Sequence, residues 1–125
     1  MKKLFVYSIL FLSLCSCAQE SSVKKLIQPD ELAILLEKGE IQLADVRTQG
    51  EYDKGFIKGA VLIDFYKDDF VKRMSETFDK KKPVYVYCAR GGRSNKASLL
   101  LLQNGFQKVY DLDGGYSKWT KNLKK

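Results

Sequence analysis

The sequence predicts a single α/β domain with a five-stranded, mainly parallel sheet that carries helices on both faces. Short apolar or β-branched segments alternate with amphipathic segments along the chain, and this alternation is typical of strands joined by helical crossovers. The chain has 125 residues, of which 45% are hydrophobic and 30% charged, as expected of one globular domain. It contains no His, which excludes His-ligated metal sites, Ser-His-Asp triads and Cys-His dyads.

Residues 1–16 have the features of a bacterial export signal. Lys2 and Lys3 supply a positive start, and residues 4–14 form an uncharged, mostly apolar run that is short for a membrane span. A membrane anchor that stays attached is the alternative interpretation. The segment Leu-Cys-Ser-Cys that ends at Cys17 resembles a lipobox, which implies cleavage before Cys17 and lipidation of that residue.

The lipobox resemblance implies an exported protein, anchored by lipid to a bacterial membrane and facing the periplasm. Ala18 rather than Asp follows Cys17, which in many Gram-negative bacteria permits sorting to the outer membrane. Cleavage would leave 20 basic and 15 acidic residues, a net charge of +5. Residues 17–22 then form a short polar tether, and residues 23–125 form the domain.

Strands and helices are predicted in alternation over this domain. The predicted strands are rich in apolar, β-branched and aromatic residues, and the first helix has Pro29 at its start and Gly39 just past its end. The strands are predicted at residues 23–27, 41–46, 60–64, 83–87 and 108–112. The helices are predicted at residues 29–39, 68–78, 94–104 and 115–123.

Three chemically distinctive residues stand where predicted strands end. Cys88 directly follows the strand 83–87, and Asp45 and Arg47 stand at the end of another strand. Open parallel sheets bind ligands beyond the carboxyl ends of their strands, so these residues lie where a site is expected. Cys88 is the one free thiol if Cys17 carries lipid. A buried core cysteine is the alternative interpretation.

The loop after Cys88 has the features of an anion cradle. Gly91 and Gly92 allow successive N–H groups to converge on one point. Ser94 is predicted to cap the following helix, whose N-terminus adds partial positive charge. A glycine turn that merely joins strand to helix is the alternative.

The loop is also basic. Arg90 and Arg93 flank its helix start, and residues 80–110 contain seven basic and no acidic residues. Such surroundings lower the pKa of a thiol below its usual value of about 8.5. Because the thiolate is the nucleophile, Cys88 is expected to react at neutral pH without a His base. The same charges favour small anions, either in sulfur transfer through a persulfide or in phosphoryl or arsenate chemistry.

Three segments in order resemble the signatures of rhodanese-fold sulfurtransferases. The sequence Cys-Ala-Arg-Gly-Gly-Arg-Ser at residues 88–94 is similar to the active-site loop of that family. Residues 45–60 and 112–119 resemble its two other signatures, and the match runs over about residues 23–119. The resemblance implies a single rhodanese-like domain.

The resemblance also implies a reaction, that of a thiosulfate sulfurtransferase. The cysteine of the family attacks the outer sulfur of thiosulfate, releases sulfite and becomes a persulfide. A thiophilic acceptor such as cyanide or another thiol, including a thiol of a partner protein, then takes the sulfur. By matched position Cys88 is the nucleophile, supported by Asp45 and Arg47, and no cofactor or metal is expected. The implied persulfide-binding loop consists of Ala89, Arg90, Gly91, Gly92, Arg93 and Ser94.

Roles follow for other residues of the matched segments. Asp45 and Arg47 are expected to form an internal ion pair, and Glu51 to pair with a nearby Arg. A tight turn is expected at Gly114 and Gly115. The chain departs from the family where His often stands, which is Phe56, and at Ala89, where a basic or polar residue is frequent.

Rival functions remain open at this point. A phosphatase or arsenate reductase usually has one more residue between Cys and Arg than the four between Cys88 and Arg93. A lipid-tethered module that carries or binds persulfide sulfur for a partner needs the same residues as the enzyme. Nucleic-acid binding is not expected, because the lysines are scattered and an export signal leads away from nucleic acid.

Overall fold

The computed structural model describes residues 22–124, over which strands and helices alternate as predicted. The strands are β1 (Val23–Ile27), β2 (Gln42–Asp45), β3 (Val61–Leu62), β4 (Val84–Tyr87) and β5 (Lys108–Leu112). The helices are α1 (Pro29–Lys38), α2 (Gln49–Asp53), α3 (Phe70–Thr77), α4 (Gly92–Gln103) and α5 (Gly115–Asn122). The predicted export signal and Cys17 lie outside the described residues, as does all but the last residue of the tether.

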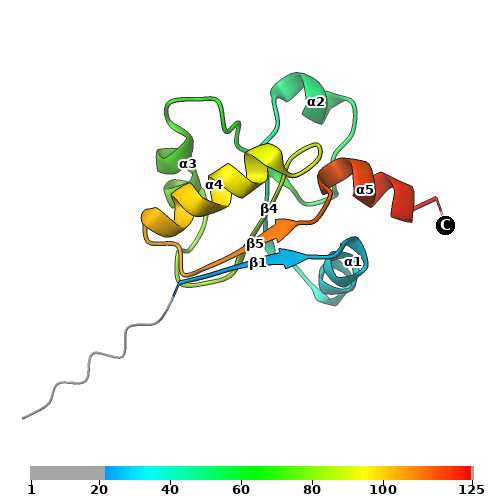
Figure 1. Cartoon of the computed structure of the whole chain (residues 1–125), viewed down its shortest axis with the longest axis horizontal. Helices are drawn as coiled ribbons and strands as arrows, with labels where there is room; N and C mark the ends of the chain where they lie inside the picture. The colour runs from blue at the N-terminus through cyan, green and yellow to red at the C-terminus, as the bar shows by residue number, and fades with distance from the viewer. Residues whose placement is uncertain (1–21, 125) are drawn as a thin grey trace, which may run out of the picture.

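The five strands form one parallel sheet in the order β1-β5-β4-β2-β3. The predicted fold class is therefore confirmed. Every strand starts at one edge of the sheet and ends at the other, because all of the pairings are parallel. Figure 1 shows the arrows of β1 and β5 side by side and pointing the same way. The first strand, β1, pairs with the last, β5, from Val23↔Lys108 to Ile27↔Leu112.

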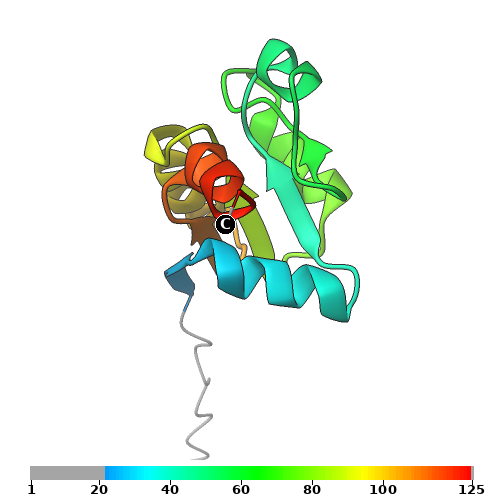
Figure 2. The same ribbon diagram turned by 90° about the vertical axis from the view of Figure 1, so that its right-hand side faces the viewer.

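Helices cover both faces of the sheet. Figure 1 shows α4 crossing one side of the strands and α1 lying on the opposite side. In the view of Figure 2, α5 (red) lies beside the start of α1 (blue), and both pack over the same face. The larger core lies under α3 and α4 and includes Phe70, Met74, Val86, Leu101 and Phe106. The second core lies under α1 and α5 and includes Leu32, Leu43, Ile57, Tyr87 and Trp119.

Helix α4 starts two residues earlier than predicted. Its N-cap is Gly91, with φ 116°, and no side chain caps it. The prediction that Ser94 is the cap is therefore wrong, because the left-handed backbone of Gly91 turns the chain before Ser94 is reached. Ser94 lies inside the first turn of α4, fully buried.

The short helix α2 was not among the predicted elements. A capping box starts it, in which the Thr48 hydroxyl accepts from the Glu51 N–H and the Glu51 carboxylate accepts from the Thr48 N–H.

Between residues 22 and 124, each helix is too short or too polar to cross a membrane.

Candidate active site

Cys88, Asp45 and Arg47 all lie at the carboxyl edge of the sheet, as the sequence predicts. Asp45 ends β2 and is the register partner of Tyr87, which ends β4. Cys88 is the next residue along, so the cysteine begins its loop beside the Asp45–Arg47 turn.

The sulfur of Cys88 is held by its own loop. The N–H of Gly91 donates to Sγ at 3.1 Å, and the thiol donates to Ser94 Oγ at 3.4 Å. Burial raises the pKa of the thiol, but two influences that favour the thiolate outweigh it: the Ser94 hydroxyl, which donates to the sulfur once the thiol has lost its proton, and the N–H groups of Ser94, Gly91 and Arg90. The pKa of Cys88 lies below its ordinary value, in the direction expected from the loop sequence.

Cys88 is also more deeply buried than a reactive thiol usually is. The residue is 1% exposed and contacts the core under α4. Its packing is therefore that of a buried core cysteine, which was the alternative interpretation of the sequence. Packing alone, however, would raise the pKa of the thiol. The hydrogen bonds to Sγ distinguish Cys88 from an inert core cysteine, and its burial favours small reaction partners.

Arg93 braces the loop through an ion pair. Its Nη1 and Nη2 donate to the two carboxylate oxygens of Glu51, each at 2.7 Å, which ties α4 to α2. The bidentate bond to Arg93 lowers the pKa of Glu51 to about 2. Glu51 therefore pairs with an Arg as expected, and it offsets part of the positive charge that Arg93 brings to the loop.

Four of the five lysines between residues 80 and 110 lie at the opposite edge of the sheet, and the fifth, Lys96, lies in α4. Residues 80–82 precede the start of β4, and Lys108 is the first residue of β5. Cys88 follows the end of β4, about 13 Å away at the usual rise of a strand. The count of seven basic residues in the sequence thus overestimates the positive charge around the Cys88 sulfur. Arg90 and Arg93 are the basic residues adjacent to Cys88 along the loop.

Asp45 and Arg47 form a buried ion pair. Arg47 Nη2 donates to Asp45 Oδ2 at 2.7 Å, and Arg47 Nε to Oδ1 at 3.0 Å, with the two side chains 0% and 4% exposed. Nη2 also donates to the Gly55 carbonyl at 2.7 Å, and the guanidinium lies 4.3 Å from the ring centre of Tyr116. The pair fixes the backbone beside the loop, and its burial places it away from solvent-borne substrate.

The start of α5 contacts the first residues of the Cys88 loop. Gly114 and Gly115 have φ of 71° and 58° and form the expected tight turn. The N–H of Ser117 then donates to the Ala89 carbonyl at 2.9 Å.

Phe56, at the position where the family often has His, stacks on the ring of Tyr52 at a centroid distance of 4.1 Å and is 45% exposed.

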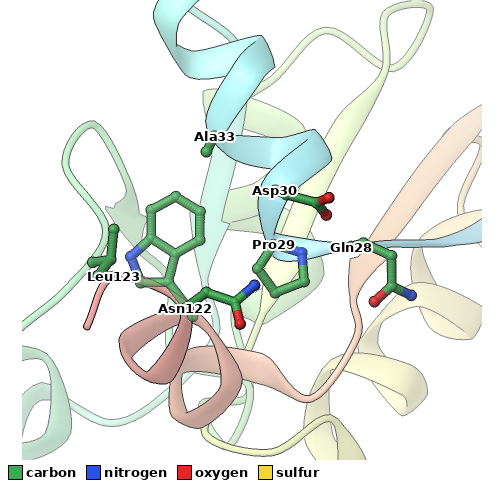
Figure 3. A pocket seen from close by; sticks show the side chains of 7 residues that line it. Gln28, Pro29, Asp30, Ala33, Asn122 and Leu123 are labelled. Atoms are coloured by element: carbon green, nitrogen blue, oxygen red, sulfur yellow. The ribbon is translucent and has the colours of Figure 1, made fainter. Parts of the chain in front are cut away.

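The hollows of the surface near Trp119 lie away from Cys88. One, of about 350 Å³, lies between the start of α1 and the end of α5 and is shown in Figure 3. Another, of about 640 Å³, is lined by residues such as Leu36, Ile57 and Lys58. Neither is lined by residues of the cysteine loop. Among the described residues, no cluster of three or more Cys, Asp or Glu side chains is arranged to hold a metal ion.

Comparison with known proteins places the fold and the loop in one family. Residues 28–122 match the family described as "Rhodanese-like domain". The chain is 39% identical over 85 residues to a protein of Coxiella burnetii named thiosulfate sulfurtransferase GlpE, covering 68% of this chain and 77% of that protein. It is 36% identical over 114 residues to thiosulfate sulfurtransferase 16, chloroplastic, of Arabidopsis thaliana, covering 84% and 94%.

A solved structure gives the same result. The crystal structure of a rhodanese-like domain protein from Staphylococcus aureus superposes with a TM-score of 0.67 at 36% identity, covering 76% of this chain and 90% of that chain. The protein belongs to the rhodanese-like domain family. Its relatives named thiosulfate sulfurtransferase support a place among the sulfurtransferases of that family.

Proposed function

We propose that this protein transfers sulfane sulfur from thiosulfate or a related donor to a thiophilic acceptor through a persulfide on Cys88. The observation that carries the proposal is the environment of the Cys88 sulfur. The sulfur accepts a hydrogen bond from the Gly91 N–H at 3.1 Å, and the pKa of the thiol is lowered. A thiolate held in this way is a nucleophile at neutral pH.

The reaction consists of two displacements at sulfur. The Cys88 thiolate attacks the outer sulfur of thiosulfate, the S–S bond of the donor breaks, and sulfite leaves with the bonding electron pair. The acceptor, cyanide for example, then attacks the outer sulfur of the persulfide. The new C–S bond gives thiocyanate, and the Cys88 thiolate leaves with the electron pair of the broken S–S bond.

The chain has what these steps require. Sulfite is a stable leaving group, so neither displacement demands a strong general acid at the leaving atom. Negative charge stays on sulfur throughout, and the loop N–H groups with the N-terminus of α4 stabilise negative charge there. The Asp45–Arg47 and Glu51–Arg93 ion pairs hold the backbone on two sides of the loop.

Intact mass before and after addition of thiosulfate tests the proposal. We expect one added sulfur atom, located on the peptide that contains Cys88, and its release as thiocyanate when cyanide is added. Cys88→Ser is the matched control, and we expect it to fold normally and to gain no sulfur. Absence of added sulfur on the unaltered protein would contradict the proposal. A stable persulfide with negligible turnover would instead support a carrier that hands sulfur to a partner protein.

We also propose that the protein is exported and anchored through lipid on Cys17, facing the periplasm. The sequence of residues 1–17 supports this proposal. The strand β1 begins at the edge of the sheet opposite to the Cys88 loop, so an anchor that precedes Val23 is compatible with an accessible loop. If Cys17→Ala remains in the membrane fraction, lipidation at Cys17 is the wrong account.

A further inference from the structure

Four lysines gather at the edge of the sheet where β1 begins. Val23, the first residue of β1, is the register partner of Lys108, the first residue of β5, and Figure 1 shows the starts of these two strands lying together. The N–H of Val23 donates to the Gln107 carbonyl at 2.8 Å, and the N–H of Gln107 donates to the Lys80 carbonyl at 3.0 Å. The four residues at this edge, here called the basal lysines, are Lys80, Lys81, Lys82 and Lys108.

The basal lysines are available to a partner outside the chain. Lys81, Lys82 and Lys108 are exposed. Lys80 is partly buried, and its ammonium group donates to the Asn104 carbonyl at 2.7 Å. Over the part of the chain that the structure describes, none of the four takes part in an ion pair. Their charges are therefore not neutralised by a direct partner within the domain.

Carboxylates offset only part of this charge. The segments that lead from a helix into β2, β4 and β5 contain two acidic residues, Glu40 and Asp79. Both lie toward β2, because Glu40 precedes that strand and the Asp79 N–H donates to the Gln42 side chain at 2.7 Å. In the sheet β4 separates β2 from β5 and β1. The edge is therefore most positive on the side where Val23 begins the sheet.

The opposite edge, where the Cys88 loop lies, is mixed in charge. Residues 64–69, in the loop between β3 and α3, contain three acidic residues and one lysine. In the Cys88 loop Arg90 is exposed, whereas Arg93 is paired with Glu51. A negatively charged surface would therefore attract the basal edge more strongly than the edge that carries Cys88.

The basal edge is also the part of the domain nearest to the proposed anchor. Val23 follows Cys17 by six residues, which span at most about 20 Å when fully extended. A lipid on Cys17 would thus keep the start of β1 close to the bilayer. Lysines are attracted to anionic lipid over roughly one Debye length, about 8 Å at physiological ionic strength. Over that distance their charge decides which side of a tethered domain faces the membrane.

We propose that the basal lysines bind the surface of a bilayer that contains anionic lipid, so that the Cys88 loop faces away from the membrane. A lipid chain and a group of basic residues together hold a protein on a membrane more firmly than either does alone. The inference rests on the anchoring proposed at Cys17, which supplies the proximity, while the lysines supply the orientation. In this orientation the Cys88 loop stays accessible to sulfur donors and acceptors on the side away from the lipid.

Acetylation of lysines on the reconstituted protein tests this orientation. The protein purified from membranes is inserted into phosphatidylcholine vesicles with or without phosphatidylglycerol, treated with a water-soluble acetylating reagent, and followed at each lysine by mass spectrometry of its peptides. We expect Lys81, Lys82 and Lys108 to react at least about threefold more slowly when phosphatidylglycerol is present. The protection should disappear in about 1 M salt, where the Debye length falls to about 3 Å. Lys54 and Lys67, exposed at the opposite edge, should react equally on both kinds of vesicle.

Two double variants with the same change in charge separate the lysines from a general effect of the anchor. Lys81→Gln with Lys82→Gln removes two charges from the basal edge, and we expect Lys108 to lose its protection by phosphatidylglycerol. Lys54→Gln with Lys67→Gln removes two charges from the opposite edge and should leave the protection of Lys108 unchanged. All four side chains are exposed, so we expect both variants to fold.

Three results would overturn the inference. They are equal acetylation of the basal lysines on the two kinds of vesicle, protection of Lys54 to the same extent as Lys108, and slower alkylation of Cys88 when phosphatidylglycerol is present. Flotation of the protein with phosphatidylcholine vesicles, measured first, tests the anchor by itself. A protein that floats with neither kind of vesicle contradicts both the anchoring and the orientation, whereas one that floats with both and shows equal acetylation contradicts the orientation alone. No sulfur donor is used, so these results are distinct from failure to gain sulfur from thiosulfate.

Discussion

The backbone N–H of Tyr116 donates a hydrogen bond to the carbonyl oxygen of Cys88 at 2.8 Å. With the neighbouring bond from Ser117 to Ala89, it fastens the first turn of α5 to the first two residues of the reactive loop. Two loop carbonyls are thereby directed at α5. The loop can then present N–H groups to the sulfur, as the Gly91 bond to Sγ shows.

Gly115→Ala should disturb both stability and the loop. A Cβ at Gly115 would lie 2.5 Å from the Cys88 carbonyl oxygen and 2.7 Å from the Ala89 carbonyl carbon. The left-handed φ of 58° adds about 1–2 kcal/mol for a residue with a side chain. We expect a loss of about 2 kcal/mol or more in the free energy of unfolding, measured with urea, and slower alkylation of Cys88.

Gly50→Ala is the control for that prediction. Gly50 lies in α2, has an ordinary φ, and nothing lies within 4 Å of its added Cβ. We expect its stability to be unchanged or slightly higher. Equal unfolding midpoints for the two alanine variants would contradict the account of the α5 turn.

The Asp45–Arg47 pair should be costly to break from one side. Asp45→Asn leaves the Arg47 guanidinium buried without its counter-charge, and loss of one partner of a buried pair typically costs about 3–5 kcal/mol. Double substitution Asp45→Asn with Arg47→Met removes the stranded charge, and we expect it to be more stable than Asp45→Asn alone. Thermal unfolding of both variants measures this, and additive losses would argue against coupling.

Acid should weaken the ion pair between Glu51 of α2 and Arg93 of α4. The pKa of Glu51 is lowered to about 2 in the folded protein from 4.5, so its stabilising effect is complete above pH 4.5 and is lost as pH falls toward 2. Because both side chains contact solvent, we expect about 1 kcal/mol after screening. Glu51→Gln should remove this part of the acid dependence of unfolding. Glu76→Gln, in an exposed pair with Lys72 at 4.0 Å, should leave it unchanged.

Tyr87→Phe should lower the free energy of unfolding, because it affects the edge of the sheet beside the Cys88 loop. The volume of the side chain hardly changes. The Tyr87 hydroxyl oxygen accepts the Ile57 N–H at 3.0 Å in a fully buried position. Its removal leaves a buried N–H unpaired, which costs about 1–3 kcal/mol. Urea unfolding measures this loss, and Tyr66→Phe, at a residue 66% exposed, is the matched control. Equal stability of the two variants would show that the Ile57 bond contributes nothing.

The fold was predictable because its signals are local. Alternating apolar segments and glycines such as Gly39 and Gly105 mark where elements start and end, and these marks do not depend on distant contacts. The boundary at α4 was wrong because Ser94 matches the residue type of a cap. A left-handed glycine three residues earlier performs that turn, and sequence alone does not reveal its φ.

The site was predictable only in part. Cys88 and its loop are contiguous, so the nucleophile and its N–H groups could be inferred from one short segment. The residues that hold the loop come from elsewhere, Glu51 from α2 and Tyr116 from α5. The family resemblance implies an Arg partner for Glu51 but does not say which Arg, and nothing in the sequence marks the Tyr116 N–H as a donor to the Cys88 carbonyl. Both contacts are tertiary, so no local pattern predicts them.

The pairing of β1 with β5 has a consequence for how the chain reaches its native state. In the described sheet the first strand hydrogen-bonds to the last and to no strand between them. Residues 23–27 thus have no partner strand until the ribosome has passed residue 112, and the two strands must come together across more than eighty intervening residues. Such long-range closure slows folding, so we expect the β1–β5 pairing to form late, after the strands between them have been made.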